Sequence, residues 1–372
     1  MKKKVLQVIT DAGSCHKMAA ASLTIEFEKV FPGKYDVKTI DLFKVADIEP
    51  FNNSDRSYAL VSGNRALASI HNLLFTVTMQ TNLGFEFFSR YANGMLLEEC
   101  VNIIKSEKPD IVICNHPVVA IIVKAAKDRL KNFKSVEVVV DPMTVPMGWA
   151  DTSADLIICA TGEAVNSLVK YGVDISKIVY PLFPINPNLA NLADKQKVIS
   201  DLNLDTSRPT VLLTGGGVGT KALKRVIDYI AKEDKYNLII LAGRIEYFKD
   251  QLQRQYGDNK HVIVLGYINN IQDMYNISDV IIAKPSAATL METELFEKKV
   301  VWTKNIDKLD AGNIEYALRN PLNRYIGDDW DKVVSTLDEL IALNPREPIQ
   351  GFARSFDESA KIVKEIDKLV KE

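Results

Sequence analysis

The stretch Leu212-Leu213-Thr214-Gly215-Gly216-Gly217-Val218-Gly219-Thr220 places a run of glycines between an apolar segment and a helical pattern. Glycines let the backbone approach a ligand closely and adopt positive φ angles. The helix that follows would offer unpaired N–H groups and the positive end of its dipole to an anion. The loop lacks the ending of a Walker A motif and the glycine spacing of a dinucleotide fingerprint. The loop predicts a diphosphate site that belongs to neither of these classes. The alternative interpretation is a tight turn that needs glycine for its conformation alone.

Short apolar runs alternate with helical patterns on both sides of this loop. Such runs are typical of strands buried on both faces of a parallel sheet, and the alternation predicts right-handed βαβ units of the α/β class. Strands are expected at Val5–Thr10, Ile111–Asn115, Val136–Val140, Leu156–Ala160, Thr210–Thr214, Leu238–Ala242, His261–Leu265, Val280–Ala283 and Val300–Thr303.

Two prolines, Pro184 and Pro187, precede a charged and polar stretch that runs to Pro209. This composition predicts a domain boundary near residue 188. We expect one Rossmann-like domain over residues 1–188, a second over 189–355, and a C-terminal helix over 356–372 that packs back on the N-terminal domain. Because ligands of such folds bind outside the carboxyl ends of the strands, the active site is expected in the cleft between the domains.

The composition is that of a folded globular protein rather than a disordered or nucleic-acid-binding one. Of the 372 residues, 47% are hydrophobic and 25% are charged, and the formal net charge is −2. No overall basic field therefore attracts nucleic acid. The four cysteines are scattered without a CxxC pair, which fits a reduced cytoplasmic setting.

A second loop with candidate donor-binding residues, Lys284–Thr289, follows the strand expected at Val280–Ala283. Ser286 and Thr289 can cap the next helix and hydrogen-bond a phosphate. Glu292 lies one turn further on, where a carboxylate suits the two hydroxyls of a ribose. The alternative is a capping arrangement with Glu292 as a solvated acid of the first turn.

A histidine follows the first strand in the loop Asp11-Ala12-Gly13-Ser14-Cys15-His16. The dipole of the helix that starts there disfavours imidazolium. We therefore expect a neutral ring that can accept a proton. A lone histidine is more often structural, but a place at a strand's carboxyl end favours catalysis. His116 also follows a strand and is the second candidate.

The segment Ser54–Ile104 holds few charges and many large apolar residues, such as Leu74, Phe75, Phe87 and Phe88. It predicts either contact with a lipid surface or an ordinary helical layer of the N-terminal domain. No uninterrupted apolar stretch is long enough to span a bilayer, so membrane contact is expected to be peripheral.

Together these segments resemble the diacylglycerol glycosyltransferases: plant-type monogalactosyldiacylglycerol synthase and bacterial processive diacylglycerol glucosyltransferase. The family's Asp-Thr-Gly-Gly-Gly-His is similar to Asp11–His16, where two glycines are replaced. Its Gly-Gly-Gly-x-Gly loop is intact at Gly215–Gly219. Its Thr-Asp segment with a later tryptophan is similar to Val140-Asp141 and Trp149.

Four more elements of the family are found in the C-terminal half of the chain. Its Cys-Gly-Arg-Asn turn is similar to Ala242–Ile245, and its Gly-Phe/Tyr element to Gly266–Ile268. Its donor loop, Lys-Pro/Ala-Gly-Gly/Pro-x-Thr-Leu/Ile-x-Glu, is similar to Lys284–Glu292, where Ser286 and Ala287 replace the glycines. In the hexose-binding Gly-Gln-Glu-x-x-Asn, similar to Lys308–Asn313, leucine replaces the glutamine while an acid and the asparagine remain.

The resemblance implies the GT-B architecture and an inverting transfer of a hexose from a UDP-sugar to a lipid acceptor such as diacylglycerol. It implies His16 as general base, with Asp141 as a second catalytic residue and Gly13 and Trp149 on the acceptor side. A peripheral place on the inner face of the membrane is expected. The implied donor-binding residues are Gly215, Gly216, Gly217, Gly219, Arg244, Tyr267, Ile268, Ser286, Thr289, Glu292, Asp310 and Asn313.

Two other functions remain open from the sequence: a sugar-nucleotide 2-epimerase and a non-catalytic scaffold that binds a nucleotide-sugar. No cofactor is expected beyond the co-substrate. Asp329-Trp330-Asp331 resembles a metal-binding Asp-x-Asp, but its acidic surroundings are more typical of a helix start, so no metal is assigned.

Overall fold

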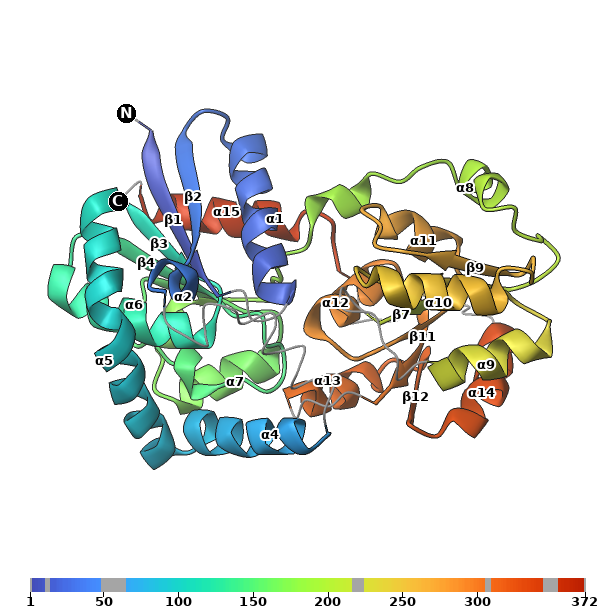
Figure 1. Cartoon of the computed structure of the whole chain (residues 1–372). Helices are drawn as coiled ribbons and strands as arrows, with labels where there is room; N and C mark the ends of the chain where they lie inside the picture. The colour runs from blue at the N-terminus through green and yellow to red at the C-terminus, as the bar shows by residue number, and fades with distance from the viewer. Residues whose placement is uncertain are drawn as a thin grey trace. The chain divides into compact units, whose positions relative to one another are not determined.

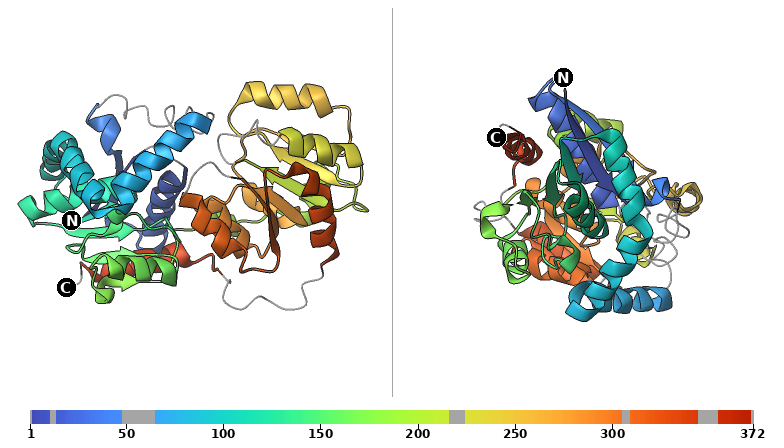
Figure 2. Two further views of the ribbon diagram at one scale, coloured as in Figure 1. Left: turned by 90° about the horizontal axis from the view of Figure 1, so that it is seen from below. Right: turned by 90° about the vertical axis from the view of Figure 1, so that its left-hand side faces the viewer.

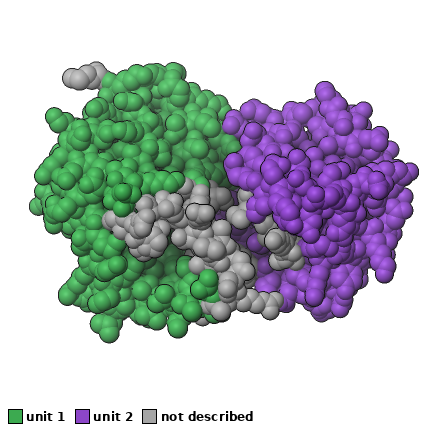
Figure 3. Space-filling view, in the orientation of Figure 1, with its two compact units in different colours: residues 1–187, 306–309, 357–372 green, residues 188–305, 310–356 purple. Residues whose placement is uncertain are grey.

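A computed structural model of the chain describes residues 2–10, 14–47, 65–215, 224–304, 309–343 and 354–370 (Figure 1). The chain forms two compact units (Figure 3). Unit 1 comprises residues 1–187, 306–309 and 357–372, and unit 2 comprises residues 188–305 and 310–356. Each unit is built on one six-stranded sheet, so two α/β folds follow one another along the chain.

In unit 1 all strand pairs run parallel, in the order β2-β1-β3-β4-β5-β6. Because β2 and β3 flank β1 on opposite sides, the strand order reverses beside β1, and the crossovers on its two sides leave in opposite directions. The strands are β1 (Lys3–Ile9), β2 (Tyr35–Asp41), β3 (Ile111–Cys114), β4 (Lys134–Val138), β5 (Leu156–Ile158) and β6 (Ile178–Val179).

Helices cover both faces of this sheet (Figure 2). Leu23 and Phe27 of α1 (Ser14–Val30) share a core with Ile362 and Ile366 of α15 (Glu358–Lys368) and with inward residues of the strands. α6 (Pro117–Leu130) packs on β3, β4 and α5 (Asn82–Glu107). The remaining α-helices of the unit are α2 (Leu42–Val45), α4 (Arg65–Gln80) and α7 (Gly162–Lys170) in the described residues.

The sheet of unit 2 is also parallel, in the order β12-β11-β10-β7-β8-β9. Read from β9, this is the order 3-2-1-4-5-6 of dinucleotide-binding folds, which reverses between its first and fourth strands, here β7 and β10. The strands are β7 (Thr210–Thr214), β8 (Asn237–Leu241), β9 (Val262–Leu265), β10 (Val280–Ala283), β11 (Lys299–Thr303) and β12 (Asn323–Gly327).

One apolar core of unit 2 joins the strands to α9 (Lys224–Glu233), α10 (Glu246–Tyr256) and α14 (Val333–Ala342). Other helices carry residues of the candidate site: α11 (Ile271–Ile277), α12 (Ala287–Leu295) and α13 (Leu309–Ala317). The short α8 (Lys195–Asp201) packs on α11.

The nine strands expected from apolar runs are all present, with ends within two residues of those expected. Three more strands, β2, β6 and β12, were not predicted. β2 and β12 are edge strands that carry partly exposed polar residues, and β6 has only two residues.

The C-terminal helix α15 docks on α1. Its Asp367 is 1% exposed and accepts hydrogen bonds from Lys34 and from the hydroxyl of Tyr35. At the other end of the helix, Glu358 accepts a hydrogen bond from the backbone N–H of Phe183 at 2.8 Å. A buried apolar stripe and these three polar contacts therefore hold the last helix to unit 1.

Replacing Ile366 with alanine should lower the free energy of unfolding by about 2–5 kcal/mol, because it removes a fully buried side chain and leaves a cavity. Lys364→Ala, at an exposed position of the same helix, is the matched control and should change stability by less than about 0.5 kcal/mol. Urea denaturation measures both, and equal effects of the two variants would contradict the docking.

Candidate active site

In unit 1, His16 lies in the first turn of α1, after β1, and its ring is half-buried. Its Nδ1 forms a hydrogen bond with the backbone carbonyl of Asn115, the residue that follows β3. A carbonyl oxygen only accepts, so Nδ1 must carry the proton. The contact therefore leaves the lone pair of a neutral ring on Nε2.

His116, the second candidate, caps the N-terminus of α6, and its Nδ1 accepts the N–H of Val118 at 3.2 Å. Its ring meets that of His16 edge to face, with centroids 4.5 Å apart. The two imidazoles come from the loops after β1 and β3, the strands between which the sheet order reverses.

Burial keeps both rings neutral. Desolvation lowers the pKa of His16 to about 4, although the bond to the Asn115 carbonyl acts the other way. Burial, and then repulsion from His16, place the pKa of His116 well below its usual value. At neutral pH His16 therefore has the protonation state that a general base needs.

We expect the imidazole of His16 to titrate in the folded protein near pH 4, well below the usual 6.5. Between these values the unfolded chain binds a proton that the folded chain does not. The contribution of His16 to the free energy of unfolding is therefore complete above pH 6.5, and it declines as the pH falls toward 4. NMR titration of the ring, assigned with His16→Asn, measures the midpoint; a value at or above 6.5 would contradict burial of the site.

Asp141 follows β4 and is held by Trp149. The indole Nε1 donates to Oδ2 of Asp141 at 2.7 Å, and Trp149 is fully buried. Gly148 packs so closely on α6 that a Cβ there would lie 2.7 Å from the carbonyl oxygen of Pro117. Trp149, which is expected on the acceptor side, is buried, and its indole orients Asp141.

In unit 2, loops after four adjacent strands carry the candidate donor-binding residues. Gly215 follows β7 and is buried. Arg244 follows β8, and its guanidinium lies 3.6 Å from the ring centroid of Tyr267, which follows β9. Ile268 is next to Tyr267 and is half-buried. In a parallel sheet, all these loops leave from one edge.

The fourth loop, after β10, leads into α12. Ser286 is its N-cap: Oγ accepts the N–H of Thr289 at 3.4 Å and lies 2.9 Å from the Thr289 hydroxyl. Glu292 lies one turn further on. Burial raises the pKa of its carboxyl to about 7, against a hydrogen bond from Tyr275 that lowers it. The carboxylate is therefore half-buried and hydrogen-bonded to Tyr275, rather than a freely solvated acid of the first turn.

Asn313 of α13 is 3% exposed and donates to the carbonyl of Pro285 at 3.0 Å. The structure thus gives this residue, expected at the hexose, a contact that braces the loop after β10. Gly13, Gly216, Gly217, Gly219 and the side chain of Asp310 lie outside the described residues.

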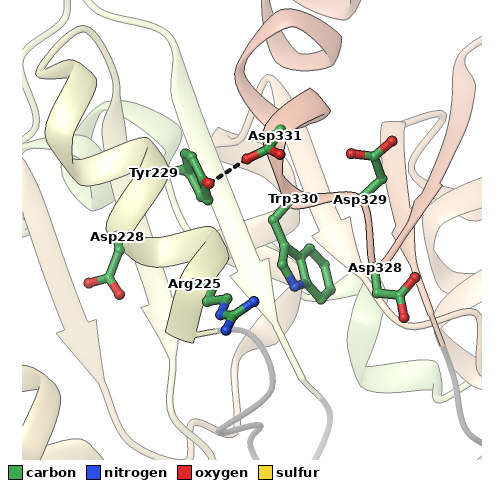
Figure 4. Close-up of a pocket in the computed structure, with 7 residues that line it drawn as sticks. All are labelled: Arg225, Asp228, Tyr229, Asp328, Asp329, Trp330 and Asp331. Carbon is green, nitrogen blue, oxygen red and sulfur yellow. Dashed lines mark hydrogen bonds between the residues drawn. The ribbon is translucent and has the colours of Figure 1, made fainter.

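A pocket elsewhere on unit 2 does not suit the donor (Figure 4). It is lined by Arg225, Asp228, Tyr229 and the segment Asp328–Asp331. Asp331 accepts from the hydroxyl of Tyr229, and Asp328 pairs with Lys304 at 2.8 Å. Its four carboxylates would repel a diphosphate, and none of the donor-binding candidates lines it. Within the described residues, no group of three His, Cys, Asp or Glu side chains could hold a metal ion.

An apolar surface runs along α4 and the start of α5 in unit 1. Leu73 and Leu74 are 63% and 59% exposed, and Leu83 and Phe87 are 81% and 74% exposed. Phe75 and Phe88 are half-buried. Of the described helices, none combines the length and apolarity needed to cross a bilayer.

Comparison with known families matches both halves of the chain. Residues 16–183 match the monogalactosyldiacylglycerol (MGDG) synthase family, and residues 210–306 match the glycosyltransferase family 28 C-terminal domain. The chain is a glycosyltransferase with the GT-B fold. The predicted resemblance to diacylglycerol glycosyltransferases is confirmed.

Relatives of known function share about a quarter of their residues with this glycosyltransferase. A chloroplastic MGDG synthase of Spinacia oleracea is 24% identical, over all of this chain and 73% of the relative. MGDG synthase 1 of Arabidopsis thaliana is 25% identical, over 87% of this chain and 62% of the relative. A processive diacylglycerol β-glucosyltransferase of Staphylococcus epidermidis is 24% identical, over 78% and 72%.

Solved structures share the fold. A UDP complex of S. aureus MnaA has a TM-score of 0.66 at 13% identity, covering 99% of this chain and 97% of that one. MurG of Acinetobacter baumannii has a TM-score of 0.62 at 14% identity, covering 98% and 99%. A UDP-N-acetylglucosamine 2-epimerase of Listeria monocytogenes has a TM-score of 0.61 at 14% identity, covering 100% and 97%. At these identities the likeness concerns the fold alone, so it does not favour an epimerase.

Sequence reasoning missed Tyr275, the partner of Glu292, and the contact of His116 with His16. The signal for His116 was its place directly after a strand. Tyr275 gave no signal, because a buried aromatic residue in a helix is typical of a core.

Proposed function

We propose that this glycosyltransferase transfers a hexose from a UDP-sugar to diacylglycerol or a similar lipid, with inversion at the anomeric carbon. The observation that carries the proposal is the meeting of polar loops at each reversal of strand order. One reversal has a neutral histidine, and the other has hydroxyl donors and a half-buried carboxylate. The similarity to lipid glycosyltransferases over both halves supports the choice of substrates.

In the proposed donor site, UDP binds to unit 2. The positive end of α12 and the hydroxyls of Ser286 and Thr289 face a diphosphate, as helix N-termini do in other anion sites. Glu292 accepts hydrogen bonds from the ribose, and the loop of Gly266–Ile268 holds the uracil. These donors carry the charge of the leaving diphosphate, so no divalent cation is needed.

In the proposed chemical step, Nε2 of His16 removes the proton of the acceptor hydroxyl. The oxygen forms a bond to the anomeric carbon while the bond from that carbon to the diphosphate breaks, and UDP leaves with the electron pair. Asp141, held by Trp149, positions the acceptor or orients the base. Because protonated His16 has a pKa of about 4, the proton moves to Nε2 as the new C–O bond develops and makes the acceptor hydroxyl more acidic.

Glu292→Ala should weaken UDP binding by about 1–3 kcal/mol, the cost of losing a charge-assisted hydrogen bond. Isothermal titration measures this, and the dissociation constant of the unaltered protein should be the same in EDTA. Unchanged affinity in the variant would show that the ribose binds elsewhere, and loss of binding in EDTA restored by Mn²⁺ would show that a metal takes part.

His16→Ala should lower turnover by about 10²–10⁴-fold, as removal of a general base does. UDP affinity should stay within a few-fold, because the proposed UDP contacts are all in unit 2. A radiolabelled UDP-sugar and mixed membrane lipids give the assay. Asp141→Asn is the comparison: if Asp141 is the base, it will be as inactive as His16→Ala. Near-normal turnover of His16→Ala would refute the assignment and favour His116.

We also propose that α4 and the start of α5 contact the membrane surface from its cytoplasmic side. Between Ala66 and Gln80 the sequence has no acidic or basic residue except His71. Exposed Leu73, Leu74, Leu83 and Phe87 give apolar area that water disfavours. Burying such a face at the lipid boundary is how peripheral helices bind.

Replacing Leu74, Leu83 and Phe87 together with serine should reduce co-sedimentation with liposomes and leave UDP binding intact, since these side chains are already exposed. Ile175→Ser is the matched control, because Ile175 is 64% exposed in the same unit but belongs to neither helix. If the unaltered protein ignores liposomes of every composition, a soluble acceptor becomes the better hypothesis.

A further inference from the structure

A buried tyrosine of unit 2 contacts the candidate ribose-binding carboxylate. Tyr275 lies on α11 and Glu292 on α12, and the hydroxyl of Tyr275 donates to Oε2 of Glu292 at 2.9 Å. Tyr275 is 1% exposed, and its ring packs against that of Phe296 with centroids 5.4 Å apart. The donor is therefore fixed by packing on a helix that does not carry the acceptor.

This contact determines what the carboxylate can do. Oε2 of Glu292 accepts the hydrogen bond from the Tyr275 hydroxyl. This bond fixes the rotation of the carboxylate and so the direction in which Oε1 points. Burial and the nearby charge of Glu292 raise the pKa of Tyr275 well above its usual value, so the phenol stays protonated and can only donate while Glu292 is ionised. Among the described residues, burial and the Tyr275 hydroxyl are the influences that shift the pKa of Glu292.

We propose that Tyr275 is a positioning residue of the nucleotide site: its hydroxyl holds Glu292 so that the free carboxylate oxygen, in ionised form, accepts hydrogen bonds from the ribose. This inference rests on the proposed function, which places the ribose at Glu292. A carboxylate held in one rotamer loses less conformational entropy when the nucleotide binds. Its ionised form also makes the stronger hydrogen bond to a hydroxyl.

A purely structural role for Tyr275 predicts a different result. As a core aromatic residue, Tyr275 would affect stability through its ring, and the ring is kept in Tyr275→Phe. The hydroxyl is then irrelevant to UDP, and the pH dependence of UDP binding does not change. As a positioning residue, Tyr275 stabilises ionised Glu292, and its removal must change that pH dependence.

The experiment is isothermal titration with UDP between pH 5.5 and 8.5. In the unaltered protein, affinity should rise with pH through about 7, as Glu292 ionises. In Tyr275→Phe the pKa of Glu292 rises, so the rise in affinity should move to higher pH. UDP should bind roughly 3–10-fold more weakly at pH 7, the loss expected for one hydrogen bond. Ionisation of the UDP phosphate is common to all variants and cancels in the comparison.

Two further variants make the test specific. Tyr236→Phe is the matched control, because Tyr236 is a buried tyrosine of the same unit whose hydroxyl donates to a different carboxylate, that of Asp338. It should bind UDP like the unaltered protein at every pH. In a Glu292→Gln background the rise in affinity due to Glu292 is absent. Adding Tyr275→Phe should then leave the remaining pH dependence of UDP binding unchanged.

The outcomes separate this inference from the function on which it rests. If UDP binds and Glu292→Gln weakens binding, but Tyr275→Phe has the affinity and pH midpoint of the unaltered protein, the positioning role is refuted and the donor site stands. If Tyr275→Phe shifts the midpoint as strongly in the Glu292→Gln background, the effect is not transmitted through Glu292 and the inference fails. If the unaltered protein does not bind UDP at any pH, the proposed function fails first.

Discussion

The parallel hydrogen-bond ladder between adjacent strands places the loops that carry the central candidate residues among those that the structure describes. In unit 1, Val8 of β1 pairs with Cys114 of β3, and in unit 2, Thr214 of β7 pairs with Ala283 of β10. Strands in register end level with each other, so the chains that leave them start side by side. The order of each sheet reverses between the two strands just named. Their crossovers therefore leave in opposite directions, and the space beyond the strand ends stays open to a ligand. His16 and His116 meet at one reversal, and the loops of Gly215 and Ser286 leave from the other.

Burial then tunes these groups in opposite directions from one cause. Removing water penalises the charged form, so it lowers the pKa of a histidine and raises that of a carboxyl. The pKa of His16 falls to about 4, so its ring is neutral at pH 7, and the pKa of Glu292 rises to about 7. Each is also held by one hydrogen bond that favours its charged form: His16 donates to the carbonyl of Asn115, and Glu292 accepts from the hydroxyl of Tyr275. Desolvation sets the direction, and the single partner orients the side chain and limits the shift.

The parts that sequence could predict are those that local pattern determines. Strands buried on both faces, such as β7 and β10, read as apolar runs with clear ends. Edge strands such as β2 alternate with polar residues because one side meets solvent, so they resemble loops. The cap at Ser286 was predictable because its partner is three residues away. The hydrogen bonds of His16 with Asn115 and of Trp149 with Asp141 depend on which loops the sheet brings together. The spacing of these residues in the sequence does not predict that geometry.

The loss of family glycines in the loop after β10 is compatible with a working donor site. Ser286 has φ of −73° and ψ of 149°, a conformation open to any L-residue, so the turn does not require glycine there. Gly243, in the turn after β8, has φ of 75°, and there the glycine is kept. A diphosphate needs unpaired N–H groups at the helix start and room for its oxygens. The small side chains of Ser286 and Ala287 leave that room, and Ser286 adds a hydroxyl, while the N–H of Ser286 itself donates to the carbonyl of Lys284 at 2.8 Å. The backbone conformation therefore permits L-residues at Ser286 and Ala287, whereas the positive φ at Gly243 favours glycine.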